Sequence, residues 1–156
     1  MSPAGPRLTP GATGAGIAAR QAAHGWTEMP LAYAVTSPGR ARARLGAELT
    51  SNTVPRDLVD DALLVVSELV ANAVRHGRPL WAPPPGRILL RWELGPGPRG
   101  PILVEVVDGG GVPPVPADAD LGAVRGRGLV IVGGLARVWG YDVALRETRV
   151  WALLGR

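Results

Sequence analysis

The stretch SELVANAVRHG, at residues 67–77, belongs to the best-defined element of the chain. Pro55 lies where the first turn of a helix is expected, and Gly77 supplies a C-terminal stop. Between them, apolar residues recur at helical spacing: Leu58, Ala62, Val65, Val66, Leu69 and Ala73. The pattern predicts one long amphipathic helix that packs its apolar stripe against the rest of a domain.

The polar residues of this helix lie away from the apolar stripe. Glu68 and Asn72 are four residues apart and Arg75 follows three later, so at about 100° per residue all three fall within a sector of roughly 60°. An amide oxygen suits magnesium, a carboxylate can orient or deprotonate a nucleophile, and an arginine can bind phosphate. The face indicates a magnesium-phosphate surface, although a solvated helix face with an incidental polar pair gives the same pattern.

Two later segments also favour ligand binding. VEVVDGGG, at residues 104–111, ends a buried-looking strand in Asp108, and the glycines after it allow close approach of the backbone to a ligand. A carboxylate there suits an exocyclic amine, and a simple turn is the alternative. GRGL, at residues 126–129, opens a helix whose free N–H groups favour anions, although glycine before a helix is common.

The remaining elements follow from shorter patterns. Leu31, Tyr33 and Val35 alternate with smaller residues and predict a strand, after which Ser37 and Pro38 form an N-cap and first-turn pair. We further expect a helix to about Leu49, a hairpin of strands over Ile88–Leu94 and Ile102–Val107, a helix over Leu129–Leu135, and strands over Val138–Ala144 and Val150–Leu154.

Helices and strands segregated in this way favour the α+β class, as a two-layer α/β sandwich with a mixed or antiparallel sheet and its helices on one face. Solvent or a homodimer contact could cover the other face.

Residues 1–25 are rich in glycine, alanine and proline and predict a disordered tail, which leaves one domain over residues 26–156. Residues 109–125 lack periodicity and predict a long loop.

Composition excludes several classes of site. The chain has no cysteine and two histidines, which excludes a disulfide framework and a cysteine-rich zinc site. All 17 basic residues are arginine, so neither a P-loop nor a protein kinase of the common eukaryotic type is possible, since both place a lysine on the phosphates. The net charge is +4, but the arginines are scattered and only Arg40, Arg42 and Arg44 cluster. No apolar run nears the roughly 20 residues that span a bilayer. We therefore expect a cytoplasmic protein without a nucleic-acid or membrane partner.

The three motifs together, in this order, resemble the GHKL superfamily of gyrase, heat-shock chaperone, histidine kinase and mismatch-repair ATPases. Within it, ELVANAVRHG, VVDGGG and GRGLVIV are similar to the anti-sigma-factor serine/threonine kinases of spore-forming and filamentous bacteria. The resemblance covers about residues 27–156 and implies the Bergerat fold with ATP and Mg²⁺ as cofactors.

The resemblance also implies residue roles. Glu68 matches the catalytic glutamate, Asn72 the magnesium ligand and Asp108 the adenine-binding aspartate. The other nucleotide-binding positions that it implies are Arg75, Gly110, Gly126, Arg127, Gly128, Leu129 and Thr148. Two positions depart from the pattern: Val112 and Glu147 stand where many members have glycine. Val112 affects how far the loop that covers the phosphates, the phosphate lid, can move. Glu147 affects the contact that Thr148 makes with adenine.

The resemblance implies a kinase that binds a sigma factor, a small anti-anti-sigma antagonist protein, or both, and phosphorylates the antagonist on serine. A catalytically silent ATP-binding switch is the main alternative, and a basic nucleic-acid binder that uses the fold as a scaffold is another. His76 is interpreted as a helix-end residue, because no cysteine or serine motif offers it a nucleophile. The three tryptophans on expected strands are interpreted as core: Trp92, Trp139 and Trp151.

Overall fold

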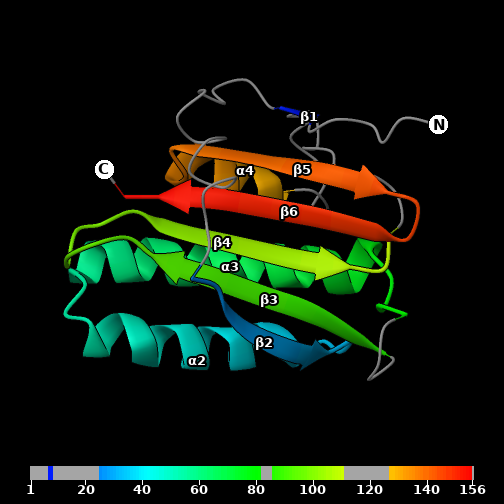
Figure 1. Ribbon diagram of the computed structural model, residues 1–156, viewed down its shortest axis with the longest axis horizontal. Coiled ribbons are helices and arrows are strands. Elements are labelled where there is room, and N and C mark those ends of the chain that lie inside the picture. Colours follow the sequence, from blue (N-terminus) through cyan, green and yellow to red (C-terminus); the bar gives the residue numbers. More distant parts are fainter. Residues whose placement is uncertain (1–6, 9–24, 82–85, 111–126, 156) are drawn as a thin grey trace.

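The computed structural model describes residues 7–8, 25–81, 86–110 and 127–155 (Figure 1). Its elements in chain order are β1 (Arg7–Leu8), β2 (Thr27–Ala32), α2 (Ser37–Ser51), α3 (Arg56–His76), β3 (Arg87–Leu94), β4 (Ile102–Asp108), α4 (Arg127–Leu135), β5 (Val138–Ala144) and β6 (Glu147–Leu154). Most of the predicted tail and loop, with Val112 and Gly126, lies outside the described residues. Within the predicted tail, β1 forms a two-residue strand beside β5.

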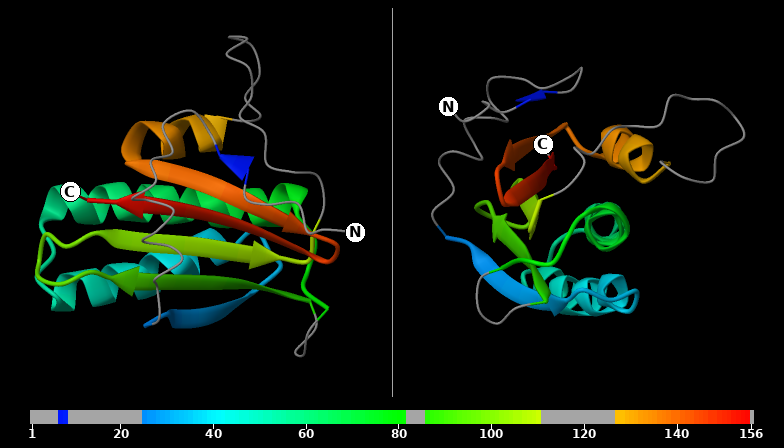
Figure 2. Two further views of the ribbon diagram at one scale, coloured as in Figure 1. Left: turned by 45° about the horizontal axis from the view of Figure 1, so that its top comes forward. Right: turned by 90° about the vertical axis from the view of Figure 1, so that its right-hand side faces the viewer.

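The strands form one sheet in the order β1-β5-β6-β4-β3-β2, and every neighbouring pair is antiparallel. The helices of the described residues, α2, α3 and α4, all cover the same face of this sheet (Figure 2). The predicted α+β two-layer sandwich is therefore confirmed. The central strand β4 is buried along all seven residues, and its register places its last residue, Asp108, beside Thr148 of β6.

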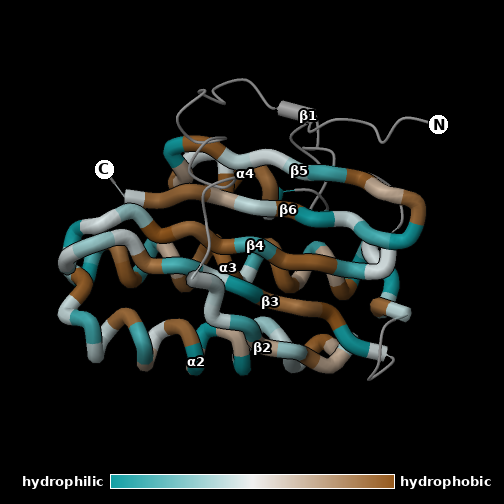
Figure 3. The backbone as a smooth tube through the Cα atoms, viewed as in Figure 1, coloured by the Kyte–Doolittle hydropathy of each residue, from teal (hydrophilic) through white to brown (hydrophobic). Residues whose placement is uncertain are grey.

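The core lies between the sheet and the helices. The buried residues of α3 recur at helical spacing, as its sequence predicts: Ala62, Val65, Val66, Leu69, Val70 and Ala73. On α2 the stripe repeats every four residues, at Ser37, Ala41, Leu45 and Leu49. Trp92 and Trp139 pack into this core, as expected, and Figure 3 shows the apolar stretches of the central strands. Burial of one large apolar side chain stabilises the fold by about 1.5–3 kcal/mol.

The segment before α2 differs from its prediction. β2 ends at Ala32, so Tyr33 and Val35 do not continue the strand, and the side chain of Val35 is 88% exposed. The chain turns because the amide of Ala34 and the hydroxyl of Ser37 both donate to the carbonyl of Ala32. Ser37 therefore stabilises this turn instead of capping the helix, and Thr36 occupies the N-cap position without a side-chain bond.

The face of the sheet opposite the helices carries a second apolar cluster. It contains Leu103, Val138, Trp151 and Leu153, with Trp26 packed against them. All four are buried, so simple exposure of this face to solvent, one of the two expected alternatives, is wrong there. Trp151 is core as predicted, but on this face. The homodimer alternative stays a prediction.

Candidate functional site

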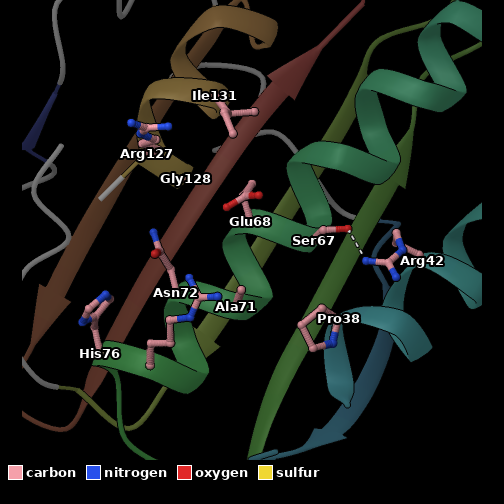
Figure 4. Close-up of a pocket in the computed structure, with 11 residues that line it drawn as sticks. Pro38, Arg42, Ser67, Glu68, Ala71, Asn72, His76, Arg127, Gly128 and Ile131 are labelled. Carbon is pink, nitrogen blue, oxygen red and sulfur yellow. Dashed lines mark hydrogen bonds between the residues drawn. The ribbon is translucent and has the colours of Figure 1, made fainter. Parts of the chain in front are cut away.

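The polar face of α3 lines a cavity of about 790 Å³ (Figure 4). Glu68, Asn72, Arg75 and His76 all contribute to its wall. Glu68 and Asn72 are half-buried, while Arg75 and His76 are exposed. The helical spacing therefore brings together the carboxylate, the amide and the guanidinium that the sequence singles out. His76 ends the helix, as expected, and also lines this wall.

The start of α4 forms a second wall of the cavity, through Arg127, Gly128 and Ile131. A Cβ atom at Gly128 would lie 2.6 Å from the Oε2 atom of Glu68, so the helix approaches Glu68 this closely only with glycine there. The first N–H groups of a helix lack partners within it and favour anions. The cavity therefore combines a carboxylate with an anion-binding helix start.

Asp108 lies at the far end of α3, where close packing holds it in place. A Cβ atom at Gly77 would lie 2.5 Å from the Cγ atom of Asp108, and one at Gly109 would lie 2.1 Å from the carbonyl oxygen of Pro79. The amide of Gly109 donates to the carbonyl of Arg78 at 2.6 Å. Two glycines thus let the end of β4 pack directly on the chain that leaves α3.

Asp108 is buried, with only 4% of its surface exposed. Burial raises its pKa above the usual range of an aspartate, because desolvation disfavours the charged form. Backbone N–H donors, including Gly110 at 2.8 Å, oppose this shift, and the nearby charge of Glu147 adds to it. Gly110 itself adopts a positive φ of 93°, a conformation that favours glycine.

Thr148 lies beside Asp108 on the neighbouring strand. It belongs to β6, not to the segment before the last strand as predicted, and its side chain is buried. Within the described part of the chain, its hydroxyl oxygen has no hydrogen-bond partner. Buried polar groups without partners are uncommon in proteins. A buried carboxyl beside a free hydroxyl fits a ligand that has both a donor and an acceptor, as the edge of adenine has.

The structure separates the remaining predicted site residues. The side chain of Leu129 is buried in the core and does not line the cavity, so only its backbone can face a ligand.

Among the described residues, no group of three or more histidine, aspartate or glutamate side chains could hold a metal ion. Any magnesium held by Asn72 would therefore depend on ligands from a nucleotide or from water.

Sequence reasoning missed four residues of this region. Gly77 ends the helix and also makes room for the side chain of Asp108. Its backbone is extended and would accept other residues, so it is this close contact that requires glycine. The hydroxyl of Tyr33 donates to the carbonyl of Gly77 at 2.9 Å. Arg42 and Ser67 extend the cavity toward α2. The only sequence signal was local: Arg42 in a cluster of arginines, and Ser67 beside Glu68.

Comparison with known proteins decides the family. The model of the histidine kinase-like ATPase domain matches residues 32–152. The chain belongs to this family. No curated protein matches it. Membership confirms the predicted superfamily and implies an ATP-binding domain, so the cavity and Asp108 lie within a region expected to bind nucleotide.

Among solved structures, this histidine kinase-like ATPase domain is similar to the RsbU and RsbW domains of Rv1364c from Mycobacterium tuberculosis. The two are 20% identical, with a TM-score of 0.61, over 85% of this chain and 33% of that one. The chain thus spans about a third of that protein, and the likeness shows the fold. Within the described residues, none of the helices is both long and apolar enough to cross a membrane.

Proposed function

We propose that this protein is an ATP- and magnesium-dependent protein serine/threonine kinase that regulates transcription through a protein partner. One observation carries the proposal: Glu68 and Asn72 line one cavity, and the first turn of α4 packs against Glu68 through Gly128. A carboxylate beside a metal ligand and an anion-binding helix start are the groups that phosphoryl transfer to a hydroxyl needs.

Asp108 and Thr148 form the adenine end of the proposed nucleotide site. The carboxylate of Asp108 accepts a hydrogen bond from the exocyclic amine, and the hydroxyl of Thr148, which has no partner in the described part of the chain, bonds a ring nitrogen. Gly110 holds Asp108 through its amide. His76 lines the cavity and the next residue, Gly77, packs on Asp108, so the proposed adenine end adjoins the cavity at the end of α3, although neither Asp108 nor Thr148 lines it.

The phosphates are proposed to lie along the cavity. Arg75, Arg127 and the backbone of Gly128 and Leu129 supply positive charge and N–H donors, and Gly126, outside the described residues, belongs to the same motif. Asn72 supplies a hard oxygen ligand for magnesium. When bound, the ion neutralises charge on the β- and γ-phosphates and orients them.

Glu68 is proposed as the general base. Its carboxylate accepts the proton of a serine or threonine hydroxyl, the hydroxyl oxygen forms a bond to the γ-phosphorus of ATP, and the bond from that phosphorus to the bridging oxygen breaks to release ADP. The position of Glu68 beside Gly128 supports this role, because the helix start that would bind the γ-phosphate lies against it.

The proposed partners are a sigma factor, a small anti-anti-sigma antagonist protein, or both, with the antagonist as phosphate acceptor. Support comes from the sequence motifs. We further propose a cytoplasmic protein whose tail, residues 1–25, is dispensable for the fold of residues 26–156, with no direct contact to nucleic acid or membrane. A homodimer is compatible with this proposal.

The first prediction tests the kinase itself. With labelled ATP and small antagonist proteins from the same genome as acceptors, Glu68→Gln should slow phosphate transfer by roughly 10²–10⁴-fold while ATP affinity, measured by calorimetry, stays nearly unchanged. Asn72→Ala should lower both rate and affinity, because it removes a metal ligand. Asp60→Asn is a matched control, since Asp60 is an exposed carboxylate on the same helix.

Mass spectrometry of the acceptor should locate the phosphate on a serine or threonine. A wild-type protein that binds ATP and its partner but transfers no phosphate contradicts the kinase and favours the silent switch. A wild-type protein that binds no adenine nucleotide contradicts both.

A further inference from the structure

Tyr33 is anchored at three points. Its amide donates to the carbonyl of Gly86 at 3.2 Å, which fixes the turn after β2, and its ring packs against the core between the sheet and the helices. Its hydroxyl donates to the carbonyl of Gly77 at 2.9 Å. Because the first two contacts fix the ring, the hydroxyl is directed at one atom, the carbonyl oxygen of the residue that follows α3.

That carbonyl belongs to the peptide group between Gly77 and Arg78, which we call the linking peptide. The N–H of the same group is that of Arg78, and a hydrogen bond from it is one of the contacts that stabilise the charged form of Asp108. A peptide group is planar, so its C=O and its N–H move as one unit. The linking peptide is therefore held at its C=O by Tyr33 and binds Asp108 through its N–H.

Close packing joins the linking peptide to the end of β4. A Cβ atom at Gly77 would lie 2.5 Å from the Cγ atom of Asp108, and the amide of Gly109 donates to the carbonyl of Arg78 at 2.6 Å. The carboxyl group of Asp108 also accepts a bond from the amide of Gly110, two residues along the same segment, at 2.8 Å. Of these two donors to the carboxyl group, the N–H of Arg78 ties it to the end of α3. The direction of the carboxyl group thus depends on how the linking peptide is oriented.

Hydrogen bonds that share a peptide group strengthen one another, because a donor at the C=O polarises the group and makes its N–H a better donor. We propose that Tyr33 is a positioning residue for adenine, and that it orients the Asp108 carboxylate through the linking peptide. The proposal rests on the proposed function, in which Asp108 accepts a hydrogen bond from the exocyclic amine. It adds that the turn after β2 contributes to adenine recognition without touching the nucleotide.

The test removes the hydroxyl and compares two nucleotides. Tyr33→Phe keeps the ring that packs against the core, so the variant should fold like wild type. Tyr141→Phe is the matched control, because Tyr141 is the only other tyrosine of the chain and its ring packs against the same core from β5. Calorimetry with magnesium measures the affinity of the full chain for ATP and for purine riboside triphosphate, which lacks the exocyclic amine.

Tyr33→Phe should lower the affinity for ATP about twofold to tenfold, the effect of weakening one hydrogen bond. Its affinity for purine riboside triphosphate should stay that of wild type, because this nucleotide offers no amine to the carboxylate. In the Asp108→Asn background, the same tyrosine substitution should change ATP affinity less, since the two residues act through one network. Tyr141→Phe should bind both nucleotides as wild type does.

The carboxyl group itself gives a second measurement, in nucleotide-free protein. Loss of the hydroxyl weakens the bond from Arg78, so the pKa of Asp108 should rise further above its usual range in Tyr33→Phe, as followed by the ¹³C signal of the carboxyl carbon. In Tyr141→Phe protein grown with 3-fluorotyrosine, only position 33 carries the label. Its hydroxyl is a stronger donor, so the pKa of Asp108 should fall, and this measurement does not depend on the folding of Tyr33→Phe.

Three results overturn the proposal while the proposed function stands. These are equal ATP affinity of wild type and Tyr33→Phe, an equal loss of affinity for both nucleotides, and a pKa of Asp108 that does not respond to 3-fluorotyrosine. The second result would show that Tyr33 supports the whole site and not the adenine contact. Failure of wild type to bind any adenine nucleotide would overturn the proposed function, and the role of Tyr33 with it.

Discussion

The two ends of the proposed nucleotide site are built in different ways. At the adenine end, Asp108 and Thr148 are buried in the sheet, and Gly77 and Gly109 allow contacts that no larger residue could make. At the catalytic end, Glu68 and Asn72 are half-buried on a helix face, with a wide cavity in front of them. The adenine end is held by tight backbone packing, whereas the catalytic end depends on helical spacing and on one contact between Gly128 and the flexible end of the Glu68 side chain.

This difference has a consequence for mutations. A change at the adenine end disturbs the packing of β4, β6 and the end of α3 together, so affinity and folding stability should fall together. A change at the catalytic end alters a polar surface that contributes little to the core, so the rate should fall without loss of stability. Substitutions should thus lower stability and nucleotide affinity together only at the adenine end of the site.

Gly77→Ala should give the largest effect at the adenine end. The new Cβ would lie 2.5 Å from the Cγ atom of Asp108 and 2.6 Å from the carbonyl oxygen of Ala73, so backbone must shift. We expect a loss of about 1–3 kcal/mol in the free energy of unfolding. ATP affinity should fall roughly tenfold to a hundredfold, because the displaced carboxylate loses a charged hydrogen bond. Denaturant unfolding and calorimetry measure the two quantities.

Gly134→Ala is the matched control for this substitution. Gly134 lies in α4, and nothing lies within 4 Å of a Cβ atom placed there. Alanine favours a helix more than glycine does, so this variant should be as stable as wild type or up to about 1 kcal/mol more stable. Equal behaviour of the two variants would contradict the packing argument.

Gly128→Ala tests the catalytic end with a smaller expected effect. The new Cβ would lie 2.6 Å from the Oε2 atom of Glu68, but this atom ends a flexible side chain that can move away. Stability should therefore change little, while the displaced base should slow phosphate transfer about tenfold. Thermal melts and the labelled-ATP assay separate the two effects. A large loss of stability would show that this end too is held by packing.

Local patterns predicted most of the fold. The long helix α3 and the β3–β4 hairpin follow from residues close together in sequence, because helical spacing and strand alternation report directly on burial. Glu68, Asn72 and Arg75 were predicted to share a face for the same reason. The end of β2 could not be predicted, since Tyr33 leaves the strand to bond the carbonyl of Gly77, 44 residues away.

The other differences from the sequence-based expectations have separate origins. Ser37 has the residue type and position of an N-cap, but its hydroxyl bonds the carbonyl of Ala32 in the turn before the helix. Thr148 lies inside β6 because that strand pairs from Glu147 onward with β5. Arg42 meets Ser67 across 25 residues. Only the Arg42–Ser67 contact depends on how α2 packs against α3. The other two are local, but the spacing of apolar residues reports neither side-chain hydrogen bonds nor where strand pairing begins.

The pH dependence of stability should give the smallest effect, and it tests the burial of Asp108 directly. Because burial raises the pKa of this carboxyl in the folded state, the folded protein retains a proton that the unfolded chain loses first, from just above pH 3.8, the ordinary value for aspartate. The unfolded state is therefore favoured progressively as pH rises, and the contribution of Asp108 to stability falls until its folded pKa is passed.

Other carboxyl groups titrate in the same range, so the quantity to measure is the difference in unfolding free energy between wild type and Asp108→Asn. In nucleotide-free protein, the free energy of unfolding of wild type minus that of Asp108→Asn should become smaller as pH rises from about 4 toward neutrality. ATP affinity should change in the opposite sense, since only the carboxylate is a charged acceptor for the adenine amine. The ratio of wild-type to Asp108→Asn affinity should rise across that range, and ionisation of ATP cancels in this ratio. If this stability difference stays constant or grows with pH, Asp108 is not desolvated in the folded protein. The adenine end would then not differ from the catalytic end in burial, as the comparison above requires.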